Sequence, residues 1–156
     1  MPLNKIALLL FSSLLLISAV SCGGKLPPRP EGMPNPVSCT IIVQDESGTP
    51  IDKALVVLRP EDSEWTASGS TDTSGRTSVK TNGLYNGAVP GKYKVLISKS
   101  EIISTGQMSD EGTEVTQTNV LIDPKFSKKE ATPFTLEVPV SGTCTETFKV
   151  SPPAKR

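Results

Sequence analysis

The sequence predicts an all-β protein folded as a β-sandwich. Short stretches along the chain alternate apolar and polar residues with a period of two, which is the pattern of half-buried strands. Clusters of glycine, proline, aspartate and serine separate these stretches, as turns between strands do. No segment carries a sustained helical period. Many short strands with turns between them are typical of two packed sheets.

The first half of the domain divides into four expected strands. In the first of them, Cys39, Ile41 and Val43 share one face. A run of five apolar residues, rich in β-branched side chains, comes next and suits a central strand. A tight turn follows the third strand, because Asp72 can accept bonds from the backbone ahead of it and Gly75 can take a positive φ. The expected strands are the segment from Val37 onward, Ala54–Leu58 ended by Pro60, Trp65–Thr71 and Arg76–Thr81.

The second half has one clear strand and several weaker ones. Tyr93, Val95 and Ile97 alternate with lysines, which predicts a strand with one buried face. The polar and poorly patterned segment Ser100–Glu114 is expected to be a flexible insertion. The remaining expectations are a glycine-bearing loop at Asn82–Gly91, strands at Lys92–Lys99 and Val115–Ile122, a loop at Asp123–Thr132, and a closing hairpin of Phe134–Val138 and Thr143–Val150.

The N-terminus has the pattern of a secretory signal. Lys5 precedes an apolar run that ends in small residues and Cys22. Ala19–Cys22 resembles the lipobox of bacterial lipoproteins, which implies cleavage before Cys22 and lipidation of its thiol; the alternative is an ordinary signal peptide with a chance cysteine. The expected parts are a signal peptide (1–21), the lipidated cysteine with a Pro/Gly-rich tether (22–36), a β-sandwich (37–151) and a disordered tail (152–156).

Composition excludes several classes of function. The chain has 16 basic and 16 acidic residues, and this balance gives no electrostatic case for binding nucleic acid. The basic cluster of Lys125, Lys128 and Lys129 is short and is interpreted as a solvated loop. Histidine is absent, which excludes Ser-His-Asp and Cys-His nucleophile systems and the usual histidine-rich metal sites. We therefore expect no catalytic residues, no cofactor and no metal.

Three motifs resemble the carboxypeptidase regulatory-like family. They are Gly48–Ile51 leading into Ala54, Thr71–Gly75 and Gly87–Ile97. The segments Asp123–Phe126 and Thr132–Val138 resemble the closing half of small bacterial lipoproteins that carry this domain alone. The resemblance implies a prealbumin-like (transthyretin-like, Ig-like) Greek-key β-sandwich of seven to eight strands. It also implies an accessory module, because enzymes of the same fold depend on histidines that this chain lacks.

Cys39 and Cys144 are the candidate disulfide. A secreted domain meets an oxidising compartment, where paired thiols become bridges. The two cysteines lie in the first and last expected strands, each on the apolar face. In the prealbumin-like fold that the chain resembles, the first strand neighbours a late one, which makes bonding distance plausible. The alternative is two buried free thiols.

Other candidate sites have a simpler structural interpretation beside the functional one. Four acids in turns suggest a calcium site, but no EF-hand spacing is present, and solvated turn acids are favoured. Lys53 is a weak candidate for an isopeptide cross-link, since it sits at a turn and the last strand has no asparagine. Trp65 and Tyr85 could form an aromatic platform for sugar or peptide, or could cap one end of the sandwich, which is favoured. The four acids are Asp45, Glu46, Asp52 and Asp72.

These observations lead to two expectations of function. The first is a non-enzymatic envelope lipoprotein, held to the membrane by its lipid, whose β-sandwich serves as a structural or protein-interaction module. The alternative is a glycan- or peptide-binding module that uses loops at one end, including Asn82–Ala88 and Ser100–Glu114. Gly23, rather than aspartate, follows the cysteine, which favours the outer membrane, facing the periplasm or the cell surface. The expected partners are the membrane and an unidentified envelope protein or glycan.

Overall fold

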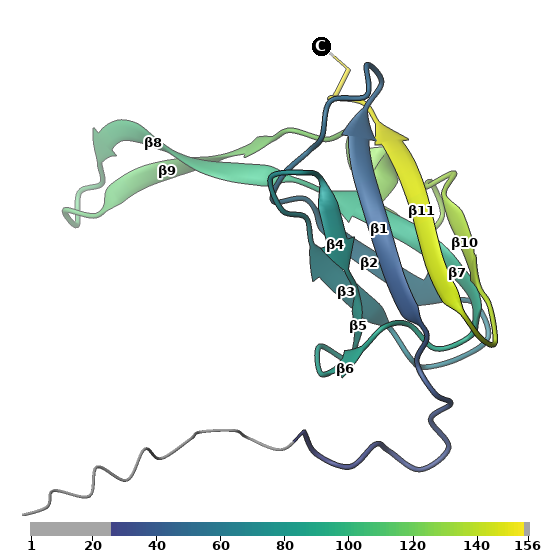
Figure 1. The fold of residues 1–156 in the computed structure, drawn as a ribbon. Helices are drawn as coiled ribbons and strands as arrows, with labels where there is room; N and C mark the ends of the chain where they lie inside the picture. The colour runs from purple at the N-terminus through teal and green to yellow at the C-terminus, as the bar shows by residue number, and fades with distance from the viewer. Residues whose placement is uncertain (1–25, 155–156) are drawn as a thin grey trace, which may run out of the picture.

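The computed structural model describes residues 26–154, which form an all-β fold with two packed sheets and a separate hairpin (Figure 1). A three-stranded sheet has the order β11-β1-β4, and a six-stranded sheet has the order β10-β7-β2-β3-β5-β6. The remaining two strands, β8 (Ser100–Met108) and β9 (Glu114–Val120), pair only with each other in the described residues. The β-sandwich that the sequence predicts is therefore confirmed.

The smaller sheet is built around β1 (Ser38–Asp45). This strand is parallel to β11 (Thr143–Val150) and antiparallel to β4 (Arg76–Ser78). Its alternate residues Cys39, Ile41 and Val43 are buried, as the period of two predicts. The first and last strands of the domain thus lie side by side in one sheet.

The larger sheet has β7 and β2 at its centre. Val56 and Leu58 of β2 and Tyr93, Val95 and Ile97 of β7 are at most 1% exposed, so these two strands supply the inner face of this sheet. The strands, in their order across the sheet, are β10 (Thr135–Val138), β7 (Gly91–Ser98), β2 (Leu55–Pro60), β3 (Ala67–Ser70), β5 (Lys80–Thr81) and β6 (Tyr85–Asn86).

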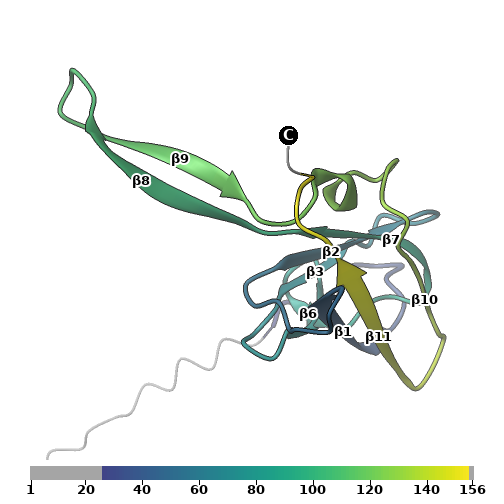
Figure 2. The same cartoon turned by 90° about the horizontal axis from the view of Figure 1, so that it is seen from above.

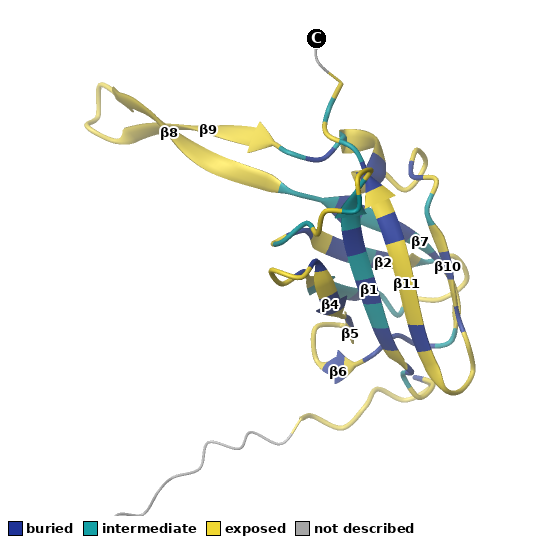
Figure 3. Cartoon of the chain, turned by 45° about the horizontal axis from the view of Figure 1, so that its top comes forward, coloured by how far each residue is buried: buried dark blue, intermediate teal, exposed yellow. Residues whose placement is uncertain are grey.

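One edge of the core is closed by aromatic side chains. The Phe134 ring lies 5.0 Å from that of Phe126 and 5.0 Å from that of Phe148, measured between centroids. Phe126 belongs to a short 3₁₀ helix, η1 (Pro124–Ser127), within a segment expected to be a loop. The buried residues lie between the two sheets, while the hairpin of β8 and β9 is exposed along its length (Figure 3).

Two expectations about strand pairing are wrong. Arg76–Thr81 is not a single strand, because Val79 separates β4 in one sheet from β5 in the other. Phe134–Val138 and Thr143–Val150 do not form a hairpin: β10 pairs with β7, whereas β11 crosses to pair with β1. Both errors arise because neighbours in sequence were assigned to one sheet, whereas a sandwich closes by passing chain between its sheets.

The polar segment after β7 is also different from the expectation. Ser100–Glu114 is not an irregular insertion; it contains all of β8 and the turn into β9. Its side chains carry no alternating apolar signal because neither face of this hairpin is buried. Nine strands form the two sheets, more than the seven to eight expected, partly because the two-residue strands β5 and β6 fall in segments assigned otherwise.

Candidate functional site

The hairpin Ser100–Val120, here called the arm, is the most exposed ordered part of the described chain. It projects sideways from one end of the sandwich, well clear of both sheets (Figure 2). Its first strand, β8, begins two residues after β7 ends, so a central strand of the sandwich runs on into the arm. The arm is therefore an extension of the larger sheet's backbone, with a defined direction.

Two contacts fix the root of the arm. The Leu121 N–H donates to the Lys99 carbonyl across the base of the hairpin, at 2.9 Å. The Lys99 Nζ pairs with the Asp52 carboxylate at 2.7 Å, and this contact lowers the pKa of Asp52. Since Asp52 lies in the connection between β1 and β2, this ion pair ties the arm's base to the body of the sandwich.

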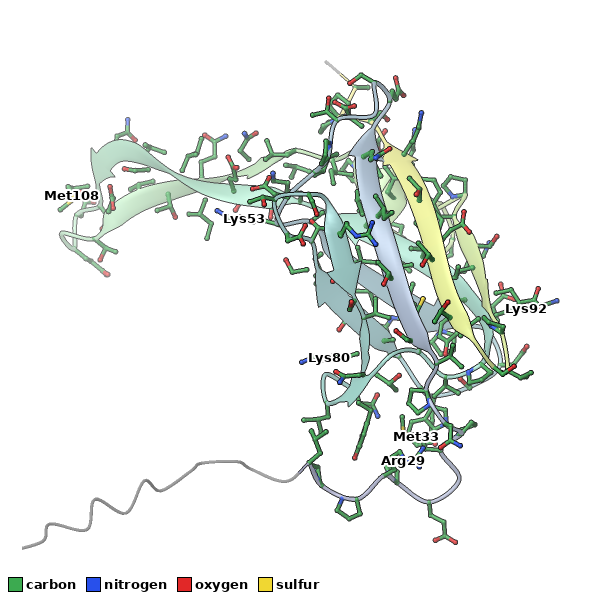
Figure 4. All side chains as sticks on the ribbon, in the orientation of Figure 1. Arg29, Met33, Lys53, Lys80, Lys92 and Met108 are labelled. Atoms are coloured by element: carbon green, nitrogen blue, oxygen red, sulfur yellow. The ribbon has the colours of Figure 1, made fainter. Side chains whose placement is uncertain are left out.

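The surface of the arm combines apolar and acidic side chains. Five of its large apolar side chains are exposed, led by Ile102 at 76% and Met108 at 68%, the latter near the tip (Figure 4). The other three are Ile103, Val115 and Val120. The arm also carries the carboxylates of Glu101, Asp110, Glu111 and Glu114 and has no lysine or arginine.

Cys39 and Cys144 are register partners on the parallel strands β1 and β11. Both are buried, and both are free thiols here. Burial, with a smaller effect from Cys144, raises the pKa of Cys39 well above its ordinary value. The structure thus brings the two predicted cysteines together, and their oxidation to a disulfide stays a prediction. Cys22 lies outside the described residues.

Trp65 and Tyr85 lie together at the end of the sandwich away from the arm. They pack with Met33 and Val89 in a small cluster separate from the main core. The Tyr85 hydroxyl donates to the Pro28 carbonyl at 3.1 Å, so part of the expected tether covers this end of the domain. Figure 4 marks the position of Met33 there. In this arrangement the two aromatics cap the sandwich, and a sugar or peptide would have to displace the covering segment.

Two of the turn acids, Asp45 and Asp72, accept hydrogen bonds from residues of their own turns. The Asp45 carboxylate accepts from the Ser47 hydroxyl and the Thr49 N–H, and the Asp72 carboxylate accepts from the Ser74 hydroxyl and N–H. These bonds lower the pKa of both carboxyls. Among residues 26–154, no group of three or more histidine, cysteine, aspartate or glutamate side chains is placed to hold a metal ion.

A shallow depression of about 260 Å³ lies where β10 meets β7, with Lys92 and Glu137 on its lining. It is smaller than the usual pocket for a drug-sized ligand. Tyr93 also lines it, but its hydroxyl donates to the Val89 carbonyl at 2.7 Å and is held inside the domain. The charged groups here are two acids and a lysine on an open surface, which do not form an enclosed binding site.

The sequence interpretation predicted one strand of the arm, since the expected strand Val115–Ile122 overlaps β9, but it missed β8 and the pairing of the two strands. A weak signal was present: the β-favouring residues of Glu114–Val120 follow a turn at Gly112, and a long stretch after Lys99 has no basic residue. No helix within residues 26–154 has the length and apolar character needed to cross a membrane.

Comparisons with known proteins do not assign a family. No family model matches the chain, and no curated protein matches it. Among solved structures, the fold is similar to part of a 9R-lipoxygenase from Cyanothece PCC8801, at 11% sequence identity and a TM-score of 0.37. The match covers 81% of this chain and 19% of the lipoxygenase, so the chain spans less than a fifth of that protein. A likeness at this level supports no conclusion about activity.

Proposed function

We propose that the protein is a non-enzymatic lipoprotein of the cell envelope, anchored through Cys22, whose β-sandwich serves as a protein-interaction module. The signal-like N-terminus and its cysteine support the anchor. The absence of histidine from the chain supports a role other than nucleophilic catalysis. The resemblance of the sequence to accessory β-sandwich modules of small lipoproteins agrees with the anchor and with a non-catalytic role.

The observation that carries this proposal is the placement of two features at opposite ends of the sandwich. The segment that follows the cysteine reaches the domain beside β6, where Tyr85 contacts Pro28, and the arm leaves from the other end (Figure 1). An anchor at the first end would leave the arm on the side of the domain that faces away from the anchored residue. That arrangement suits a module that is held at one end and binds at the other.

The anchor is tested by replacing its thiol. Cys22→Ser should leave the fold intact and move the protein from the membrane fraction to the soluble fraction, because acylation at this position would be lost. Cys39→Ser is the matched control, since it removes a thiol from the sandwich and should leave the protein in the membrane fraction. Labelling of cells with radioactive palmitate should mark the parent chain and the Cys39 variant only. Membrane retention or labelling of the Cys22 variant would refute the anchor.

A further inference from the structure

We propose that the outer edge of β9 is a strand-addition site for an extended, basic segment of a partner protein. This inference deepens the proposed interaction module and does not depend on the lipid anchor. In strand addition, a peptide pairs its backbone with an open sheet edge and places alternate side chains on the two faces. The argument rests on the hydrogen-bond pattern of the arm, on the regularity of β9 and on the arm's charge.

The hydrogen-bond pattern shows which backbone groups are open. The bond from the Leu121 N–H to the Lys99 carbonyl makes this pair a hydrogen-bonded one, and such pairs alternate with pairs whose N–H and C=O groups point away from the partner strand. Ser100 with Val120, Ile102 with Thr118, and Ser104 with Thr116 are therefore pairs of the second kind. On β9, the N–H and C=O groups of Thr116, Thr118 and Val120 point to the outer edge.

The edge of β9 is more suitable than that of β8. The register of β8 shifts between Ser104 and Met108, and Gly106 in that stretch has a φ of 71°. Such irregularities disturb an edge and discourage pairing. By contrast, β9 is a regular strand of seven residues without glycine or proline, and every one of its residues is exposed. It has no lysine, although edge lysines are a common protection against unwanted pairing.

The acidic charge of the arm indicates that the partner segment is basic. Four of the chain's 16 acidic residues are on the arm, whereas all 16 basic residues lie elsewhere. Glu114 stands at the start of β9, and Asp110 and Glu111 form part of the tip beside it. Lysine or arginine side chains on an added strand would meet these carboxylates, which favours encounter and register. Pairing between two copies of the arm would instead bring eight carboxylates together.

The test uses the full-length chain and a short synthetic peptide in which lysine alternates with valine. We expect saturable binding, measured by fluorescence anisotropy of the labelled peptide, and slower amide exchange at Thr116, Thr118 and Val120. Thr118→Pro removes an outward N–H without removing a bond inside the hairpin, so it should weaken binding about tenfold or more. Thr118→Val keeps the backbone donor and is the matched control, which should bind like the parent.

Two further peptides separate strand addition from simple attraction of charges. The same peptide methylated on every backbone nitrogen keeps its lysines but has no backbone N–H to donate from either edge. A version with glutamate for lysine keeps its backbone donors but reverses the charge. Neither peptide should bind. Equal binding by the methylated peptide, or by the Thr118→Pro variant, would overturn the proposal. Sedimentation of the chain alone serves as a further check, because dimers that Thr118→Pro dissociates would assign the edge to a second copy instead. If the peptide does not bind while the protein is still found in the membrane fraction, the strand-addition site is rejected and the lipid anchor is not.

Discussion

Cys39 and Cys144 are register partners on adjacent parallel strands, although 104 residues separate them in the chain. Both cysteines are buried and hold free thiols in this structure. We predict that they form a disulfide when the chain matures in an oxidising compartment, by exchange with the disulfide form of a thiol oxidoreductase. Denatured, unreduced protein should then show no titratable thiol at Cys39 or Cys144, and two reactive thiols there would refute the bridge.

The same bridge predicts a difference in stability. Closing a loop of about 100 residues stabilises the folded state by about 4–5 kcal/mol in the chain-entropy model. Urea unfolding of the Cys22→Ser chain, with and without reductant, should reveal a difference of that order. The chain with Cys144→Ser added is the control, and its midpoint should be the same in both conditions.

Tyr93 should make the fold sensitive to alkaline pH. Burial raises the pKa of its hydroxyl from 10.0 to about 12. The folded state therefore holds this proton more tightly than the unfolded state, so the stabilisation is full below pH 10 and declines as the pH rises toward 12. Denaturant unfolding from pH 9 to 12 should show a steeper loss of stability in the parent than in Tyr93→Phe.

Tyr93→Phe should also lower stability at neutral pH, by about 1–2 kcal/mol, because the Val89 carbonyl loses its 2.7 Å hydrogen bond. An identical slope for the two proteins between pH 10 and 12 would contradict the assignment of the alkaline effect to Tyr93.

Gly87 allows the backbone at Val37, directly before β1, to approach closely. A Cβ at this position would lie 2.2 Å from the Val37 carbonyl oxygen, and the residue's φ is 100°. Gly87→Ala should therefore destabilise the fold by about 3 kcal/mol. Gly48→Ala is a matched control, because Gly48 has a φ of 91° with no atom within 4 Å of the added Cβ. We expect it to cost about 1 kcal/mol, and equal midpoints in urea unfolding would show that the contact with Val37 has no effect.

Acid should loosen the root of the arm. Lys99 lowers the pKa of Asp52, so their ion pair is present above the ordinary carboxyl pKa of 3.8 and is lost as the pH falls through the lowered value. The Leu121 amide, which donates to the Lys99 carbonyl, should therefore lose protection from exchange, relative to the intrinsic rate at each pH, in that range. Asp52→Asn should show the lower protection at neutral pH and no further loss of protection on acidification. A root whose exchange is the same in both proteins would contradict a role for the pair.

The sequence was most informative where burial imposes a pattern. The alternation of Ile41 with Val43, and of Tyr93 with Val95, predicts β1 and β7 because one face of each strand packs in the core. β8 of the arm gave no such signal, since a strand exposed on both faces has no reason to alternate. The partner of β10 could not be predicted either, because pairing between strands far apart in the sequence depends on long-range packing that neighbouring residues do not encode.

Part of the candidate site was also predicted, because its cysteines lie on the buried faces of their strands. Cys39 and Cys144 could be brought together from their apolar faces and from what the resemblance to the prealbumin-like fold implies about the first and last strands, and Trp65 with Tyr85 share the predicted end of the sandwich. The covering of Tyr85 by Pro28 could not be anticipated, because a proline-rich segment has no periodic face that indicates what it contacts.

The continuity of β7 with β8 has a mechanical consequence. A pull on the arm is transmitted along one backbone into β7, which is hydrogen-bonded on one side to β2 and on the other to β10. Because ladder bonds run across the strands, a force along the strand axis loads them together in shear instead of opening them one at a time. If the N-terminus is anchored and a partner binds the arm, as we propose, β7 would pass the tension between them into the sandwich in this shear geometry.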